Sequence, residues 1–173
     1  MKKTLLALAL IGITSTYAHL SYAAPAEIKY DKFKDTTHAE AAKARGPSER
    51  WFDVVAVYPG QTFTGPTNII ELVFLSTHNS SLDSSWQYLT CHNFDLLADG
   101  KHVAIEKNLH GGQVHSGFVS EQVIDVISLD ALKQLASASV VETQVCNTQQ
   151  TLDSDDMDSL KSVAAELTKK EVK

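Results

Sequence analysis

The chain has 173 residues, a formal net charge of −6 and 43% hydrophobic residues. It contains no internal repeat and no low-complexity run, and its length is enough for one domain with a buried core. Its acidic balance argues against a nucleic-acid or anionic-membrane binder, because such proteins usually carry a basic patch.

The first 23 residues have the features of an export signal. Two lysines precede the apolar run Thr4–Ile13, which is well short of the roughly 20 residues that span a bilayer. Ser21-Tyr22-Ala23 places small residues at the −3 and −1 positions of a cleavage site. We therefore predict a signal peptide over 1–23 and a single globular domain over 24–173. Removing the signal takes away two lysines and no acid, so the net charge changes from −6 to −8.

Strand-like patterns dominate the chain as far as residue 127. Tight turns and alternating or continuous apolar residues predict five segments. They are an edge strand within Ala24–Asp35, a strand over Trp51–Tyr58, a short strand or bulge over Gln61–Thr64, a central strand buried on both faces over Asn68–Ser76, and a strand over Gly117–Ile127.

Three polar segments separate these strands. Thr36–Arg50 is interpreted as one or two helical turns over Ala39–Ala44, or as a loop, and Thr77–Ser84 as a loop. In Asn108–Ser116, the Gly111-Gly112 pair predicts a turn or bulge.

The stretch from Ser85 to Glu106 predicts a β-hairpin. Apolar and polar residues alternate over Trp86–Leu97, and Asp99-Gly100 is a residue pair typical of a type I′ turn. Such a turn places apolar residues opposite one another: Leu96 opposite Val103, and Phe94 opposite Ile105.

Two helices are predicted in the C-terminal third, with a strand over Val140–Cys146 between them. Ser128 can cap a helix over Leu129–Ser139. Asp153 can cap a second one over Leu152–Lys170. The acidic residues at its start do not fit the spacing of a calcium-binding loop. The sum is an α+β fold with a mostly antiparallel sheet of about seven or eight strands.

The two cysteines, Cys91 and Cys146, are predicted to form a disulfide, because an even cysteine count in an exported chain favours pairing. Such a cross-link stabilises by about 4 kcal/mol in the chain-entropy model. The alternative is a catalytic or metal-binding thiolate.

The candidate site residues are histidines and aromatics. His102, His110 and His115 surround the glycine pair and could together bind a transition metal. The proposed interaction residues are Trp86, Tyr88, His110 and His115, because exposed aromatics often anchor interfaces.

No catalytic signature is present: there is no nucleophile elbow, zinc-protease motif or dinucleotide fingerprint. We therefore assign no catalytic residue and no cofactor. The leading hypothesis is a non-enzymatic periplasmic or secreted protein that does not span the membrane and binds another envelope or secreted protein. Its surface is expected near Thr77–Ser84 and Asn108–Ser116. The alternatives are a histidine-based metal binder and a small hydrolase using Ser116, Ser120 or Ser128.

Overall fold

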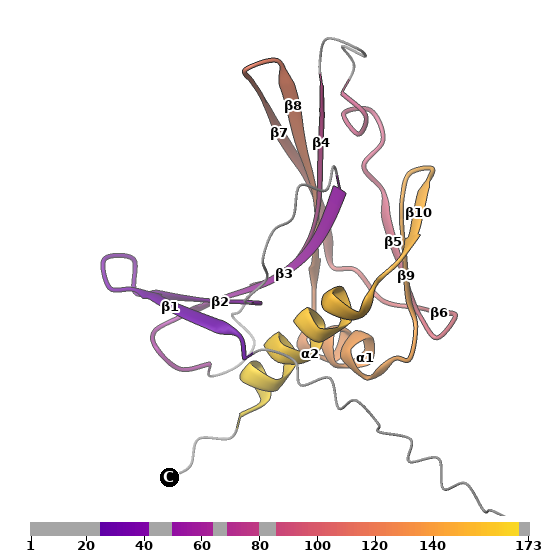
Figure 1. Cartoon of the computed structure of the whole chain (residues 1–173). Helices are drawn as coiled ribbons and strands as arrows, with labels where there is room; N and C mark the ends of the chain where they lie inside the picture. Colours follow the sequence, from indigo (N-terminus) through magenta and orange to yellow (C-terminus); the bar gives the residue numbers. More distant parts are fainter. Residues whose placement is uncertain (1–24, 42–49, 64–68, 80–85, 170–173) are drawn as a thin grey trace, which may run out of the picture.

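The computed structural model describes residues 25–41, 50–63, 69–79 and 86–169, so the predicted signal peptide lies outside the described residues. Within them the strands form two antiparallel sheets, one of six strands in the order β1-β2-β3-β4-β8-β7 and one of four in the order β10-β9-β5-β6 (Figure 1). The strands are β1 (Glu27–Asp31), β2 (Thr36–Glu40), β3 (Arg50–Pro59), β4 (Ile69–Asn79), β5 (Phe94–Ala98), β6 (Lys101–His102), β7 (Lys107–His115), β8 (Phe118–Ile127), β9 (Val141–Val145) and β10 (Thr148–Thr151).

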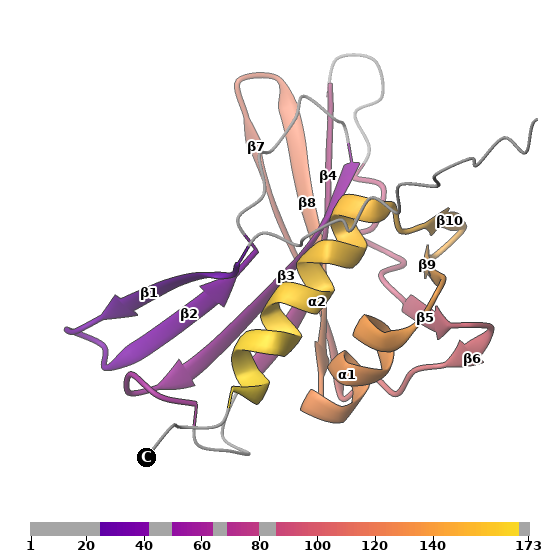
Figure 2. The ribbon, with the colours of Figure 1, turned by 60° about the horizontal axis from the view of Figure 1, so that its bottom comes forward.

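Two helices complete the fold: α1 (Leu129–Ser137) and α2 (Ser154–Thr168). Helix α2 lies along β3 on one face of the large sheet, with α1 beside it (Figure 2). The buried apolar side chains form one continuous cluster that includes Phe74 from the large sheet, Leu96 from the small sheet, and Leu132 and Leu160 from the helices. The predicted α+β architecture with two C-terminal helices is confirmed, although the described residues contain ten strands rather than seven or eight.

Local side-chain chemistry fixes the start of both helices. The Ser128 hydroxyl accepts a hydrogen bond from the Ala131 N–H, and the Asp153 carboxylate accepts one from the Asp156 N–H. Both caps confirm the prediction, because each satisfies an N–H group that the helix itself leaves unpaired. Leu152 is also buried, beside the start of α2.

The predicted hairpin turn is confirmed, but the strands beside it are shorter than predicted. Asp99 and Gly100 both have positive φ, and the Val103 N–H donates to the Leu96 carbonyl at 3.0 Å. However, β6 ends at His102, so the expected Phe94–Ile105 pairing is absent from the ladder. Residues 86–93 are not a strand, and the backbone N–H groups of Gln87 and Tyr88 bind a side chain on β8, as described below.

The large sheet overturns three predictions about loops. In the predicted loop Thr77–Ser84, Thr77–Asn79 continue strand β4, and residues 80–84 lie outside the described residues. Thr36–Glu40 is strand β2 rather than a helical turn or loop; it pairs with β1 and β3, and Ala39 is fully buried opposite Ala56. Sheet pairing on both sides therefore overrides the helix preference of alanine; residues 42–49 lie outside the described residues. The glycine pair does not interrupt β7, and the chain turns instead at Ser116-Gly117, both at positive φ.

Three further differences concern strand length and burial. Strand β4 is central, as predicted, but burial differs between its faces: Leu72 and Phe74 face the core, whereas on the other face Glu71 and Val73 are half-buried and only Leu75, of the side chains described there, is buried. Gln61–Phe63 is not a strand, and residue 64 lies outside the described residues. Strand β10, which the sequence analysis missed, pairs with β9 through the turn after Val145.

Candidate functional site

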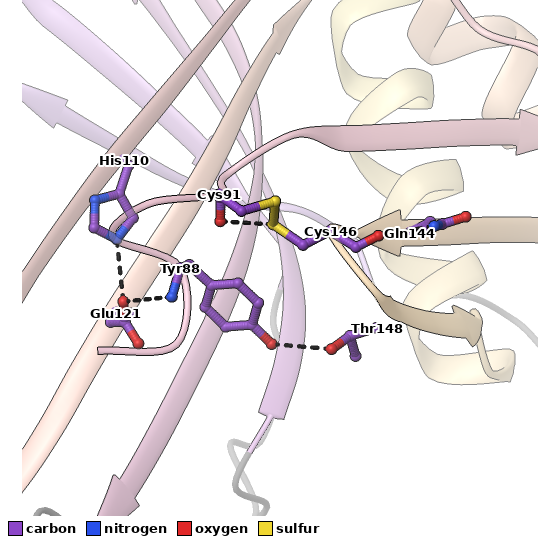
Figure 3. Close-up of a disulfide and its surroundings, with 7 residues drawn as sticks. All are labelled: Tyr88, Cys91, His110, Glu121, Gln144, Cys146 and Thr148. Atoms are coloured by element: carbon purple, nitrogen blue, oxygen red, sulfur yellow. Dashed lines mark hydrogen bonds and ion pairs between the residues drawn. A yellow bond between two sulfur atoms is a disulfide. The ribbon is translucent and has the colours of Figure 1, made fainter. Parts of the chain in front are cut away.

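A buried carboxylate on β8 organises the residues that the sequence analysis selected. Glu121 is fully buried, and its carboxylate accepts hydrogen bonds from the backbone N–H groups of Gln87 at 2.6 Å and Tyr88 at 2.9 Å. Its Oε1 also lies 3.3 Å from Nε2 of His110 on β7 (Figure 3). These contacts compensate the cost of burying the carboxylate and hold residues 86–93 against the sheet.

Aromatic rings fill the space around this carboxylate. The His110 ring stacks on that of His92 with centroids 5.6 Å apart, and Trp86 meets His110 edge-on at 6.3 Å. Trp86 is half-buried, because it packs over Gly112, where the strand has no side chain. The missing side chain at Gly112 therefore lets Trp86 pack closely against the strand, which accounts for a glycine at this strand position.

Substituting Gly112 by alanine should lower the free energy of unfolding by about 2 kcal/mol. A Cβ there would lie 2.3 Å from Cζ3 of Trp86 and 2.8 Å from the Ser120 carbonyl oxygen, so the backbone or the ring must move. Urea unfolding of G112A and of G111A as matched control measures the effect. A Cβ at Gly111 would meet no atom within 4 Å, so G111A should change stability by less than about 0.5 kcal/mol. Equal stabilities for the two variants would contradict this packing.

The predicted disulfide is confirmed. Cys91 and Cys146 are bonded, with their Cα atoms 5.9 Å apart, and join the end of residues 86–93 to the turn between β9 and β10 (Figure 3). Nearby, the Tyr88 hydroxyl lies 3.4 Å from the Thr148 hydroxyl. In this state neither cysteine is a free thiolate, which removes the thiol-nucleophile alternative.

The proposed metal ligands come from two different sheets. His102 is exposed on β6 of the small sheet, whereas His110 is on β7 of the large sheet. The backbone of His115 ends β7, and its side chain lies outside what the structure describes. Among the described residues there is no group of three or more histidine, cysteine, aspartate or glutamate side chains placed to hold a metal ion.

Most of the other candidate residues have structural roles. Tyr88 is 3% exposed and packs edge-on against Phe74 at 5.6 Å, so it is a core residue and not the exposed anchor that was proposed. The Ser128 hydroxyl caps α1, Ser116 lies in the turn between β7 and β8, and Ser120 is a half-buried residue of β8.

A second carboxylate, Asp125, is buried on the same face of β8. The Asn108 side chain donates to its Oδ1 at 2.7 Å. Burial raises the pKa of Asp125 to about 7; the Asn108 hydrogen bond opposes this rise, and the charge of Asp95 adds to it. Sequence alternation contained a signal for both acids, because Glu121 and Asp125 are in phase with buried Val119, Val123 and Ile127.

Three of the exposed large apolar residues lie in the β1–β2 hairpin, residues 27–40, whereas Leu89, Val114 and Phe118 are exposed in residues 86–93, on β7 and on β8. Ile28 is 42% exposed, Tyr30 40% and Phe33 90%. The hairpin projects from the side of the large sheet, away from the small sheet (Figure 1). The sequence analysis did not select Phe33, although its place between two lysines in a polar turn marks an apolar residue without a strand position.

Hydrogen bonds hold the turn of this hairpin in one shape. The Asp31 carboxylate accepts from the N–H groups of Phe33 at 2.9 Å and Lys34 at 3.3 Å. The Tyr30 hydroxyl donates to the Asp35 carboxylate at 2.7 Å, and the Asp35 carbonyl accepts from the Gly60 N–H at 2.8 Å. These hydrogen bonds fix the backbone of the turn, and the Phe33 side chain is exposed on it. Beside it lies an open hollow of about 570 Å³, lined by Lys29, Tyr30, Asp31, Lys32, Phe33, His38 and Glu40.

Comparison with known proteins found no matching family model, no matching curated protein and no matching solved structure. Among the described residues, neither helix is long and apolar enough to cross a membrane.

Proposed function

We propose that this is an exported, non-enzymatic interaction protein of the periplasm, or a secreted one, that binds another envelope or secreted protein through the β1–β2 hairpin. The observation that carries the proposal is Phe33, which is 90% exposed on a turn fixed by hydrogen bonds. Export is supported by the signal-like N-terminus and is compatible with the disulfide, since disulfides persist in oxidising compartments.

The energetics favour this surface over the one expected from the sequence. Burying a phenylalanine side chain in a partner's pocket contributes about 1.5–3 kcal/mol, which corresponds to roughly a tenfold to hundredfold change in affinity. A turn that is already ordered loses little conformational freedom on binding, so more of this energy is retained. At the surface expected from the sequence, Tyr88 is buried and Trp86 is half-buried against Gly112. Val114 and Phe118 beside it are 60% and 48% exposed, less than Phe33 at 90%.

Replacing Phe33 by serine should lower the affinity for the partner at least about tenfold and leave the thermal stability unchanged, because the side chain has few contacts to lose. The measurement is quantitative capture from envelope extract with the immobilised mature chain, comparing wild type, F33S and V140S. Val140 is a matched control, because it is 47% exposed and lies next to the small sheet. The same proteins captured in the same amounts by F33S and wild type would contradict the proposal.

A further inference from the structure

Strand β1 forms one edge of the large sheet. It pairs only with β2, and no other strand of the described residues lies along its outer side (Figure 2). Residues 27–30 are exposed and Asp31 is half-buried. An uncovered edge presents unpaired N–H and C=O groups, which can form a ladder with an extended segment of another chain.

The two faces of β1 differ in chemistry. Ile28 and Tyr30 lie on the face of Thr37 and Ala39, their register partners on β2, which are fully buried. The apolar face of the sheet thus continues to the edge strand. On the edge strand its residues Ile28 and Tyr30 are 42% and 40% exposed.

The opposite face carries alternating charges: Glu27, Lys29 and Asp31. The Asp31 carboxylate also caps the turn and lies 3.8 Å from the Lys34 ammonium. The Lys29 ammonium lies 3.3 Å from the Glu27 carboxylate and 2.5 Å from that of Glu40 on β2. Because Glu27 is directly opposite Glu40 in the ladder, two acids share one lysine at this end of the edge. This end therefore favours an additional cation.

This charge pattern disfavours a second copy of the chain as the added strand. Full antiparallel overlap would place Lys29 opposite Lys29 of the other copy and Glu27 opposite its Asp31, and in-register parallel pairing also places like charges together. Like charges directly opposite one another destabilise a ladder. Registers that bring opposite charges together overlap only three residues of each five-residue strand.

We propose that the partner adds an extended segment to the edge of β1, and that this segment has the pattern basic-apolar-acidic-apolar-basic. Its basic residues lie opposite Glu27 and Asp31, its acidic residue lies opposite Lys29, and its apolar residues lie beside Ile28 and Tyr30. The pattern reads the same in both directions, so it fits antiparallel and parallel addition. This inference rests on the proposed function and names the mode of binding at the same hairpin.

Two synthetic peptides test the pattern: Lys-Val-Glu-Val-Lys and its charge-swapped counterpart Glu-Val-Lys-Val-Glu, each flanked by Gly-Ser. Amide NMR titration of the mature chain gives both the affinity and the residues that respond. We expect the first peptide to bind at least about tenfold more tightly, because three cross-strand charge pairs are reversed in the second. The responding amides should lie in residues 27–31.

The double variant E27K/K29E provides a matched reversal. It exchanges two charges on the edge and keeps a cation opposite Glu40, and it leaves Asp31, which holds the turn, in place. We expect this variant to retain its melting temperature and to prefer the charge-swapped peptide.

Equal affinity for the two peptides, no binding by either, or responding amides outside β1 would overturn this mode of binding. Sedimentation showing that the unmodified mature chain dimerises through β1 would also overturn it. A failure of this kind is distinguishable from failure of the proposed function, because capture that depends on Phe33 would persist without any peptide preference.

Discussion

The double variant C91S/C146S should have a free energy of unfolding about 4 kcal/mol lower than that of the wild-type chain. The disulfide closes a loop whose ends are 55 positions apart, so its loss increases the conformational entropy of the unfolded state. In the folded state, the bond ties residues 86–93 to the turn that follows β9. Urea unfolding of the mature chain, monitored by far-UV circular dichroism, measures the change.

Reduction provides the control for this prediction. The wild-type chain in excess dithiothreitol should unfold at the same midpoint as the double variant, and the variant itself should not respond to dithiothreitol. A double variant with the same midpoint as the oxidised wild type would show that the cross-link contributes nothing to stability.

The variant D125N should be more stable than the wild type above pH 7, by up to about 4 kcal/mol. Burial raises the pKa of Asp125 from 3.8 to about 7, which corresponds to about 1.4 kcal/mol for each pH unit of the shift. The folded state therefore holds a proton that the unfolded state releases between about pH 4 and pH 7. Stability falls as the pH rises through this window and is then constant. An asparagine carries no charge at any pH and can still accept from Asn108.

Urea unfolding of both proteins from about pH 4 to pH 8 tests this sign. The difference in free energy between D125N and wild type should grow with pH and level off above about pH 7. D130N serves as the control, because the Asp130 side chain is 94% exposed and should show no such trend. A constant difference between D125N and wild type across the range would contradict the raised pKa.

The parts of the fold that the sequence predicted correctly depend on interactions between near neighbours. The caps at Ser128 and Asp153 act on N–H groups three residues later, and the Asp99-Gly100 turn sets its own positive φ values. Such features are determined within a few residues. They are therefore visible in an isolated sequence.

The parts that were missed depend on partners far away in the chain. Thr36–Glu40 becomes a strand only because β1 and β3 flank it. Residues 86–93 are not a strand, and the N–H groups of Gln87 and Tyr88 bind Glu121, more than 30 positions away. No local pattern encodes either contact.

The same distinction applies to the candidate site. The disulfide could be predicted because only one pairing of two cysteines exists within the chain. The burial of Tyr88 could not, because the alternating pattern of residues 86–89 does not say which face is covered, whereas the two lysines beside Phe33 were a signal of exposure. Whether such a residue is buried depends on which elements cover it. Neither α2 nor the small sheet covers β1 and its turn (Figure 2).

The most direct test of binding through the β1–β2 hairpin is site-specific photo-cross-linking in cells that export the chain. A photoreactive amino acid is placed at Phe33 in one variant and at Val140 in the other, since both positions are exposed. Binding through the hairpin predicts a discrete covalent adduct with another envelope or secreted protein from position 33 and none from position 140. The same adducts from both positions, or an adduct from position 140 alone, would contradict it.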